Sequence, residues 1–181
     1  MAEFRLETER LVLRSWRDAD LGPLHELCND AEVMRYLGPH QSLAELEAGI
    51  APHRVWQVEL GYCFWPIERK SDGLFLGFCG LKPGLKDSPI AHMLEIGWRL
   101  RRDCWGKGIA REAAEASLDW AWRNLDTNEV VAITVAANTR SWGLMLRLGM
   151  HRVEDGDFDH PALAENDPLR RHELYRIERP R

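Results

Sequence analysis

Residues 105–110 read Trp105-Gly106-Lys107-Gly108-Ile109-Ala110, a glycine-containing segment between two patterned stretches. Before it, residues 93–100 alternate in polarity, so that Glu95 lies on the strand face opposite to Leu94. After it, apolar residues recur at helical spacing over 110–125. The segment is therefore predicted to be a loop that joins a strand to the first turn of a helix.

A glycine loop at the N-terminus of a helix can hold a phosphate, because unpaired backbone N–H groups and the positive end of the helix dipole meet there. A Walker A loop needs Ser or Thr after its Gly-Lys, where this chain has Gly108, and Arg111 stands where a third Rossmann glycine would be. The pattern thus argues against a P-loop NTPase and against an NAD enzyme. Taken alone, a plain strand-to-helix connection explains a Gly-x-Gly turn at least as well.

The chain around the loop predicts a mixture of strands and helices. Residues 130–135 form a strand that is apolar on both faces, as a central parallel strand is, so residues 93–135 make a right-handed strand–helix–strand unit. Near the N-terminus, a strand over residues 10–14 precedes a helix over about residues 19–29.

A second helix begins at Ser42, because Glu45 stands three residues later in the spacing of a capping box. It runs toward Leu60, and we expect it to break or restart at Pro52. The remaining expected elements are a hairpin over residues 62–68 and 74–81, a short helix over about 140–148 ended by Gly149, and strands near 151–154 and 172–177.

Length and composition indicate one globular domain over residues 1–181. The chain is 45% hydrophobic and has a formal net charge of −5. Because its Lys and Arg residues are scattered, it offers no basic surface for nucleic acid or an anionic membrane, and a neutral or cationic partner suits it better. The N-terminus lacks a secretory pattern and the longest apolar run, 130–135, is too short for a membrane span, so we predict a cytoplasmic protein.

The cysteines predict no metal site. The four of them lie far apart, without a C-x-x-C pair or a nearby histidine grouping; they are Cys28, Cys63, Cys79 and Cys104. Cys104 abuts the glycine loop, where a small residue at a tight bend is the favoured interpretation and a reactive thiol the alternative. The eight tryptophans are mostly core material, and their number makes a homodimer a reasonable expectation.

The order of these segments resembles the GNAT acetyltransferase superfamily, in the branch that includes the ribosomal-protein N-terminal acetyltransferases. The resemblance covers nearly the whole chain, and it rests on Glu7-Thr8-Glu9-Arg10-Leu11-Val12-Leu13-Arg14, on Glu95-Ile96-Gly97-Trp98 with Trp105 to Ala113, and on Asn138-Thr139-Arg140-Ser141 with Leu148-Gly149-Met150. The superfamily's usual Gln or Arg is replaced by Trp105, which this branch tolerates. The resemblance implies an α+β fold: a mixed, mostly antiparallel central sheet flanked by helices, with one splayed pair of parallel strands.

The resemblance also implies a binding groove for acetyl-CoA as the co-substrate. The pantetheine arm enters the gap between the splayed strands, and the pyrophosphate lies on residues 105–110. Asn138 and Ser141 line the same groove near the thioester. The residues so expected to bind acetyl-CoA are Trp98, Arg99, Leu100, Trp105, Gly106, Lys107, Gly108, Ile109, Ala110, Asn138 and Ser141.

Acetyl transfer needs a neutral amine and a thiol that can leave. At pH 7 roughly one Lys amine in two thousand is neutral, against about one α-amine in seven, so an α-amine needs less help from a base. Glu95 is the candidate base, directly or through water, since the resemblance places the base of related enzymes there; a carboxylate that only orients the substrate or pairs with an arginine is an equally good interpretation. The usual tyrosine acid is Met145 here, so Ser141, or a water that it holds, is the candidate substitute, with a helix-start hydrogen bond as the alternative.

Two functions stay open. The first is an enzyme that transfers acetyl from acetyl-CoA to a primary amine, either a peptide N-terminus or a small molecule. The second is a catalytically silent CoA-binding sensor or interaction module, which Met145 favours. The acidic segment 154–161 either attracts a cationic amine or, as the favoured interpretation, is a solvated loop, and its spacing does not match an EF-hand.

Overall fold

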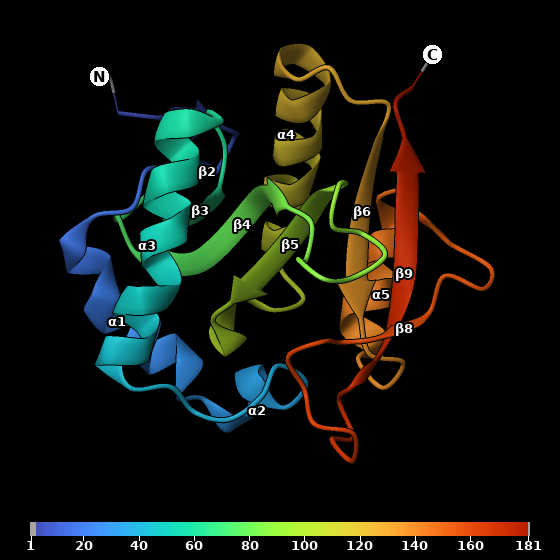
Figure 1. Cartoon of the computed structure of the whole chain (residues 1–181). Helices are drawn as coiled ribbons and strands as arrows, with labels where there is room; N and C mark the ends of the chain where they lie inside the picture. Colours follow the sequence, from blue (N-terminus) through green and yellow to red (C-terminus); the bar gives the residue numbers. More distant parts are fainter. Residues whose placement is uncertain (1–2, 181) are drawn as a thin grey trace.

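The computed structural model describes residues 3–180 and is built on one sheet in the order β1-β2-β3-β4-β5-β6-β9-β7, with β8 beside β9 (Figure 1). Adjacent strands run antiparallel except β5 and β6, which are parallel. The strands are β1 (Arg5–Glu7), β2 (Leu11–Arg14), β3 (Phe64–Arg69), β4 (Phe75–Pro83), β5 (Leu94–Leu100), β6 (Glu129–Thr134), β7 (His151–Arg152), β8 (Phe158–Asp159) and β9 (Arg171–Glu178).

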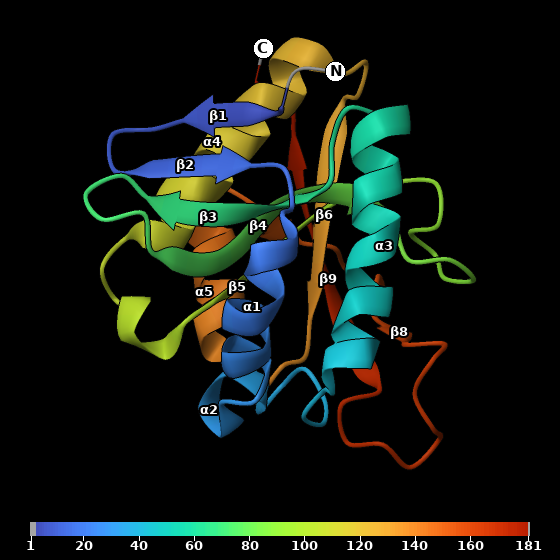
Figure 2. The same ribbon diagram turned by 90° about the vertical axis from the view of Figure 1, so that its left-hand side faces the viewer.

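Helices cover both faces of the sheet (Figure 2). They are α1 (Leu21–Cys28), α2 (Ala31–Met34), α3 (Leu43–Glu59), α4 (Ile109–Asn124) and α5 (Thr139–Arg147), with single 3-10 turns at η1 (Asp18–Asp20) and η2 (Arg102–Cys104). The first three pack on one face and share a hydrophobic cluster, whereas α4 and α5 pack on the other face against the main core. Each helix thus buries its apolar side on the sheet.

The main core assigns the two faces of β5. Leu94 and Ile96 are buried together with Ala113 and Ala114 of α4, so the even-numbered residues of β5 face α4. Because strand side chains alternate, Glu95 and its odd-numbered neighbours face α1–α3. All eight tryptophans pack in or against this core, so their number is accounted for within the chain and homodimerisation stays a prediction.

The parallel pair β5–β6 holds together at one point only. Glu95 and Val131 are register partners, and beyond them β5 continues to Leu100 and β6 to Thr134 with no further pairing between the two strands. Figure 1 shows the strands diverging from this point, with α4 as the connection between them. The predicted α+β fold with a mixed, mostly antiparallel sheet and a splayed parallel pair is confirmed.

The predicted break at Pro52 is wrong, because α3 is continuous from Leu43 to Glu59. The capping box is present: Ser42 N–H donates to Glu45 Oε2 (2.7 Å) and Glu45 N–H donates to Ser42 Oγ (3.3 Å). Pro52 has no backbone N–H to donate to the carbonyl of Ala48, so one helical hydrogen bond is missing. Both residues are exposed, and water can donate to that carbonyl instead.

Three short elements are absent from the sequence-based expectations: β1, α2 and β8. Each has two to four residues, too few for a hydrophobic period to show. The last of them, β8, lies in the acidic segment 154–161, for which a solvated loop is the favoured expectation. Part of that segment is instead a strand paired with β9. Among residues 3–180, no helix is long and apolar enough to cross a membrane.

Candidate active site

The glycine loop turns the chain from β5 into α4 through two left-handed residues. Gly106 and Gly108 have φ values of +73° and +77°, which glycine adopts without a steric penalty. Gly108 is the N-cap of the 16-residue α4, and because it has no side chain it cannot cap the first N–H groups itself. These donors, together with the positive end of the helix dipole, form a cradle that suits a pyrophosphate.

The N-terminal block of the chain fastens this loop through Glu112, on the first turn of α4. Glu112 accepts hydrogen bonds from Thr8 Oγ1 (2.5 Å), Arg10 N–H (2.9 Å) and Arg10 Nε (2.6 Å). Burial alone would raise the pKa of Glu112, but these hydrogen bonds outweigh it and lower the pKa. Arg10 Nη1 also donates to the carbonyl of Lys107 (3.0 Å), so one guanidinium holds both the loop and the helix.

Trp105 joins the two sides of the gap between β5 and β6. Its indole Nε1 donates to the carbonyl of Leu100 (3.0 Å), and the guanidinium of Arg140 lies 4.7 Å from its ring centroid. Because Arg140 belongs to α5, which follows β6, the contact brings the glycine loop next to the segment that begins with Asn138. The glycine loop and the start of α5 therefore lie beside the same gap.

Within β5, the backbone of Trp98 and Leu100 faces that gap. Arg101 N–H donates to Leu76 on the β4 side (2.9 Å), and Met93 C=O accepts from Gly84 on the same side (2.8 Å). Backbone groups alternate between the two edges of a strand, so the odd-numbered residues direct theirs to β4 and the even-numbered ones toward β6. The backbone of Arg99 consequently faces β4, and its side chain is the part of this residue that lies in the cleft.

Asn138 is the N-cap of α5, and its side chain accepts from the backbone N–H of Ser141 (3.4 Å). That bond uses the Ser141 backbone and leaves its hydroxyl available. Met145, which stands at the position of the family's usual tyrosine acid, is 2% exposed and belongs to the main core. It is thus a packing residue in this chain.

Glu95 is buried on the cleft face and forms an ion pair with Lys82, its register partner on β4. Burial raises the pKa of Glu95, and the charge and hydrogen bond of Lys82 oppose that rise. A carboxylate with a raised pKa in a cleft suits proton transfer, whereas its ion pair suits a positioning role. Lys82 was not among the residues predicted from the sequence, although a lysine inside an apolar strand was a usable signal.

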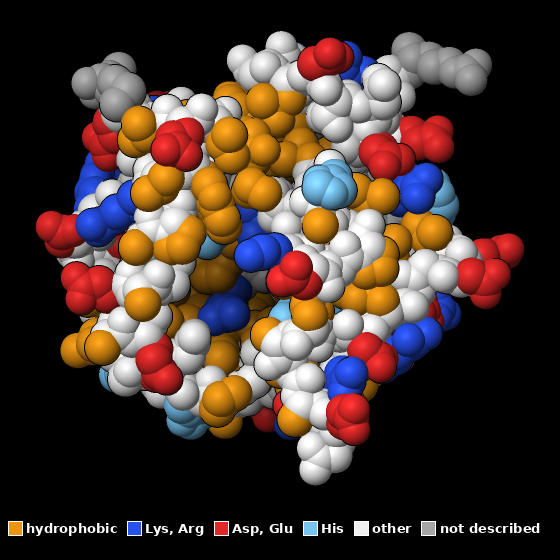
Figure 3. Space-filling view, viewed as in Figure 1, with side chains coloured by type: hydrophobic (Ala, Val, Ile, Leu, Met, Phe, Trp, Pro, Cys, Tyr) orange, Lys and Arg blue, Asp and Glu red, His pale blue; other side chains and the backbone are white. Residues whose placement is uncertain are grey.

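Aromatic residues form the floor of the cleft beside this pair. The ring of Phe64 stacks on His53 of α3 (5.1 Å between centroids) and on Phe78 of β4 (5.6 Å). Burial, assisted by the charge of Lys82, lowers the pKa of His53 to about 4, so its imidazole is neutral near pH 7. Figure 3 shows this face hollowed, with basic side chains inside and at the rim of the hollow and hydrophobic ones around it.

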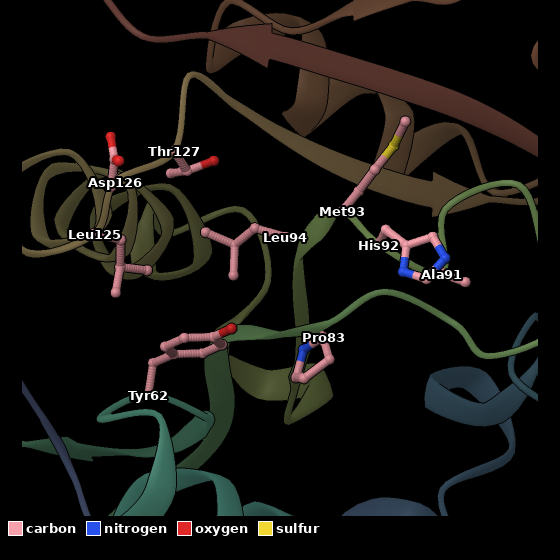
Figure 4. A pocket seen from close by; sticks show the side chains of 9 residues that line it. All are labelled: Tyr62, Pro83, Ala91, His92, Met93, Leu94, Leu125, Asp126 and Thr127. Atoms are coloured by element: carbon pink, nitrogen blue, oxygen red, sulfur yellow. The ribbon is translucent and has the colours of Figure 1, made fainter.

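A shallow cavity of about 390 Å³ lies away from the glycine loop, at the opposite end of β5 (Figure 4). Its lining comes from β4, β5 and the segments next to them, and comprises Tyr62, Pro83, Ala91, His92, Met93, Leu94, Leu125, Asp126 and Thr127. None of the residues predicted for acetyl-CoA or for catalysis is among them. The candidate site is therefore the β5–β6 gap with the adjoining cleft.

The acidic segment and Cys104 have structural partners. Asp157 pairs with Arg152 (2.6 Å) and Asp159 with Arg171 (3.3 Å), so two of its four carboxylates are already neutralised.

Burial raises the pKa of the Cys104 thiol, which agrees with a small residue at a bend and not with a reactive thiolate. Within residues 3–180, no cluster of three or more His, Cys, Asp or Glu side chains could hold a metal ion.

Comparisons with known proteins identify the family of the chain. Residues 10–151 match the family model described as an acetyltransferase (GNAT) domain. YkkB of Bacillus subtilis (strain 168) is 30% identical over 151 residues, which cover 83% of this chain and 87% of that protein.

Solved structures share the fold along nearly the whole chain. A spermidine N-acetyltransferase of Vibrio cholerae, in complex with CoA and spermine, has a TM-score of 0.71 at 19% identity and covers 94% of this chain and 96% of its own. A ribosomal-protein-S5-alanine acetyltransferase of Vibrio fischeri has a TM-score of 0.74 at 17% identity and covers 98% and 97%.

Proposed function

Because this chain belongs to the GNAT acetyltransferase family and is an acetyl-CoA-dependent acyltransferase, we propose that it acetylates a primary amine in the cleft beside Glu95. The single observation that carries this proposal is the gap that opens after the Glu95–Val131 pair and leads to the glycine loop. A tight parallel pair would leave no room for a pantetheine arm between the strands. The acceptor is either a peptide N-terminus or a small-molecule amine; the Vibrio relatives are named for spermidine and for an alanine of ribosomal protein S5.

Each part of the gap has a role in this reaction. The loop N–H groups and the first turn of α4 would bind the pyrophosphate, and the backbone groups of Trp98 that face the gap would pair with the pantetheine. The carbonyl of Leu100 already accepts the Trp105 indole N–H, so the backbone N–H of Leu100 is the group left for the pantetheine. Acetyl-CoA supplies the acetyl group and a thiol leaving group whose pKa is about 8.5. Such a thiolate leaves with little acid assistance, so a buried Met145 is compatible with transfer.

Glu95 would accept the proton that the amine loses, directly or through a water. Its raised pKa makes it a better proton acceptor than an exposed glutamate, and Lys82 holds its side chain in place. Ser141, whose hydroxyl is not used by the helix cap, would donate a hydrogen bond to the departing sulfur. Glu95 thus takes the proton from the attacking amine, and CoA leaves as a thiolate that Ser141 stabilises and that solvent then protonates.

The second candidate is a CoA-binding module without transfer activity. The burial of Met145 in the core favours it, because no tyrosine acid stands at that position. Glu95 on the cleft face and Asn138 with Ser141 at the gap favour the enzyme instead.

A thiol-release assay with acetyl-CoA separates the two candidates. The amine panel contains N-terminal peptides, Lys peptides, spermidine and aminocarboxylates, and mass spectrometry identifies the acetylated product. If the protein is an enzyme, the rate of CoA release should rise with the concentration of one class of amine. Saturable binding of acetyl-CoA, with no amine acetylated, would establish the silent module.

A further inference from the structure

We propose that the side chain of Arg99 binds an anionic group of the acceptor, so that the preferred substrate is an amine that also carries a carboxylate. The inference deepens the transferase function proposed above and rests on it. Arg99 lies on β5, four residues after Glu95 and on the same face of the sheet. A carboxylate bound there would orient the amine toward Glu95.

The register of β4 and β5 builds the cleft floor. Phe78 pairs with Arg99 at one end and Lys82 with Glu95 at the other, with two glycines facing each other between them. A Cβ atom on Gly97, one of these glycines, would lie 2.7 Å from the ring of Phe64, so the absence of a side chain there makes room for that ring. The result is an aromatic floor with a charged group at each end.

The two charged ends differ in how they are compensated. Lys82 and Glu95 neutralise each other. The guanidinium of Arg99 has no carboxylate within 4.0 Å among residues 3–180; its Nη1 donates to Cys28 Sγ (3.0 Å) and Gln41 Oε1 (3.4 Å), and it lies 5.4 Å from the ring centroid of Phe78. All of these partners are uncharged.

The donors of Arg99 are only partly used. Its Nε is buried without a hydrogen-bond partner, and Nη2 has no partner among residues 3–180 but is not fully buried. Three other arginines also have an unpartnered Nε, namely Arg170, Arg176 and Arg179. Arg170 and Arg176 each lie near a carboxylate, Asp159 (3.5 Å) and Glu129 (3.4 Å) respectively. Arg179 follows β9 and contacts Leu125 and Trp122 at the C-terminal end of α4, away from the Glu95 cleft. Arg99 thus combines a partly buried charge, unused donors and no counter-ion.

A carboxylate fits this position for a physical reason. A guanidinium keeps its charge at any physiological pH and presents its N–H groups as a planar fork that matches a carboxylate. Removing such a charge from water is costly unless an opposite charge replaces the solvent. The chain has 29 acidic residues against 24 basic ones, yet none of the acidic residues in the described range compensates Arg99, so the ligand is left to do so.

The phosphates of acetyl-CoA are the other source of negative charge near β5. The pyrophosphate cradle, however, lies at the N-terminus of α4, on the opposite face of the sheet from the side chain of Arg99, which contacts Cys28 of α1. The hollow of Figure 3 opens on the face that carries α1 and α3, where basic side chains gather. A polyamine, which is all cation, would meet a like charge there.

The test compares amines with and without a carboxylate: γ-aminobutyrate with butylamine, ε-aminocaproate with hexylamine, and the dipeptide Ala-Ala with its C-terminal amide. The wild-type protein should acetylate the carboxylate member of at least one pair with the higher kcat/KM. Arg99→Gln should lower that kcat/KM about thirtyfold and bring the two members of the pair close together. Arg99→Lys, which keeps the charge without the fork, should fall between the two.

Arg123→Gln, an exposed change on α4 that removes the same charge, is the control and should leave the preference intact. Calorimetry of acetyl-CoA with each variant separates the two sources of anion: a weakened acetyl-CoA affinity in Arg99→Gln, with an unchanged carboxylate preference, would assign Arg99 to the phosphates and overturn the inference. Equal use of both members by the wild-type protein would overturn it as well, while the transferase function would stand.

If no amine is acetylated, the proposed function fails and binding decides the inference. Each carboxylate compound is then titrated into the protein with CoA present. Binding that Arg99→Gln abolishes supports the anion site without transfer, and the absence of any binding overturns it.

Discussion

Lys82 and Glu95 are register partners across β4 and β5, and their side chains form an ion pair at the edge of the cleft. The pair sets the proton affinity of Glu95 through two opposing effects: burial raises the pKa of the carboxyl, and Lys82 holds it down. A base that works near neutral pH needs both effects, because burial alone would keep the carboxyl protonated to higher pH.

Replacing Lys82 should therefore shift the pKa of Glu95 in one direction. In Lys82→Met the pKa of Glu95 rises, since the lysine that lowered it is gone. The acidic limb of the kcat/KM profile against pH should move to higher pH, because a larger fraction of Glu95 is protonated at any given acidic pH. Lys86→Met, an exposed change in the following loop, should leave the limb in place. A shift in the opposite direction would contradict the role given to Glu95.

Glu95 and Ser141 should act on turnover and not on acetyl-CoA affinity. General acid–base catalysis contributes roughly 10²–10⁴ in rate, so we expect kcat to fall about a hundredfold in Glu95→Gln. Ser141→Ala should lower kcat about tenfold, in line with the loss of one hydrogen bond. Stopped-flow thiol release gives kcat, and calorimetry gives the dissociation constant of acetyl-CoA.

The substitution at Ser141 is clean because the cap bond to Asn138 comes from its backbone N–H, which alanine keeps. Thr139→Ala, an exposed change in the same helical turn, is the matched control. Unchanged turnover in either site variant would remove that residue from the mechanism.

Arg10 should matter for acetyl-CoA binding although it lies some hundred residues from the loop in sequence. Its guanidinium bonds both Glu112 and the carbonyl of Lys107, so Arg10→Ala loosens the loop and we expect acetyl-CoA to bind about tenfold more weakly. Arg111→Ala removes an arginine of α4 whose one ion-pair partner among residues 3–180 is Glu115, at the exposed surface, and should change the affinity little. Equal effects of the two changes would mean that charge, and not the fastening of the loop, is responsible.

His53 should make the stability of the fold depend on pH. Its pKa is about 4 in the folded chain, against 6.5 as the ordinary value, so protons favour the unfolded state. Stability from this group is complete at high pH and is lost as pH falls from about 6.5 toward about 4. Between about pH 7.5 and pH 5 the expected loss is on the order of 2 kcal/mol.

Urea unfolding of the wild-type protein and of His53→Asn at both pH values measures this contribution. Asparagine can still accept the hydrogen bond that Phe64 N–H donates to His53 Nδ1, so the variant removes the titration and keeps that bond. The stacking of His53 on Phe64 is lost at both pH values alike, so it does not affect the pH dependence of the difference. The difference in the free energy of unfolding between the two proteins should shrink as pH falls. A constant difference would show that His53 does not titrate in this range.

Most of the fold could be predicted from patterns that extend over several residues of the sequence. The alternation around Glu95 corresponds to β5, the helical spacing after Gly108 to α4, and the capping box at Ser42 to the start of α3. Local periodicity determines such elements because each face must be apolar or polar along its whole length. Elements of two to four residues, such as β8, depend on their partners and give no such pattern.

The candidate site also contains residues that the sequence predicts and residues that only the structure reveals. The glycine loop and Asn138 stand in motifs, so the sequence alone predicts them as parts of the site. The ion pair of Lys82 with Glu95 and the bonds from Arg10 to Glu112 come from strand register and from contacts between distant segments. Which of several basic residues meets which carboxylate is decided by tertiary packing, and no spacing along the chain expresses it.

The position of Trp105 beside the gap makes ligand entry detectable by tryptophan fluorescence. Its indole N–H donates to the carbonyl of Leu100, and its ring centroid lies 4.7 Å from the guanidinium of Arg140. A molecule that enters between the two strands alters the polarity around that ring, and tryptophan emission responds to polarity. Subtracting the emission of Trp105→Phe from that of the wild-type protein isolates this one ring among eight and turns it into a spectroscopic probe of ligand entry.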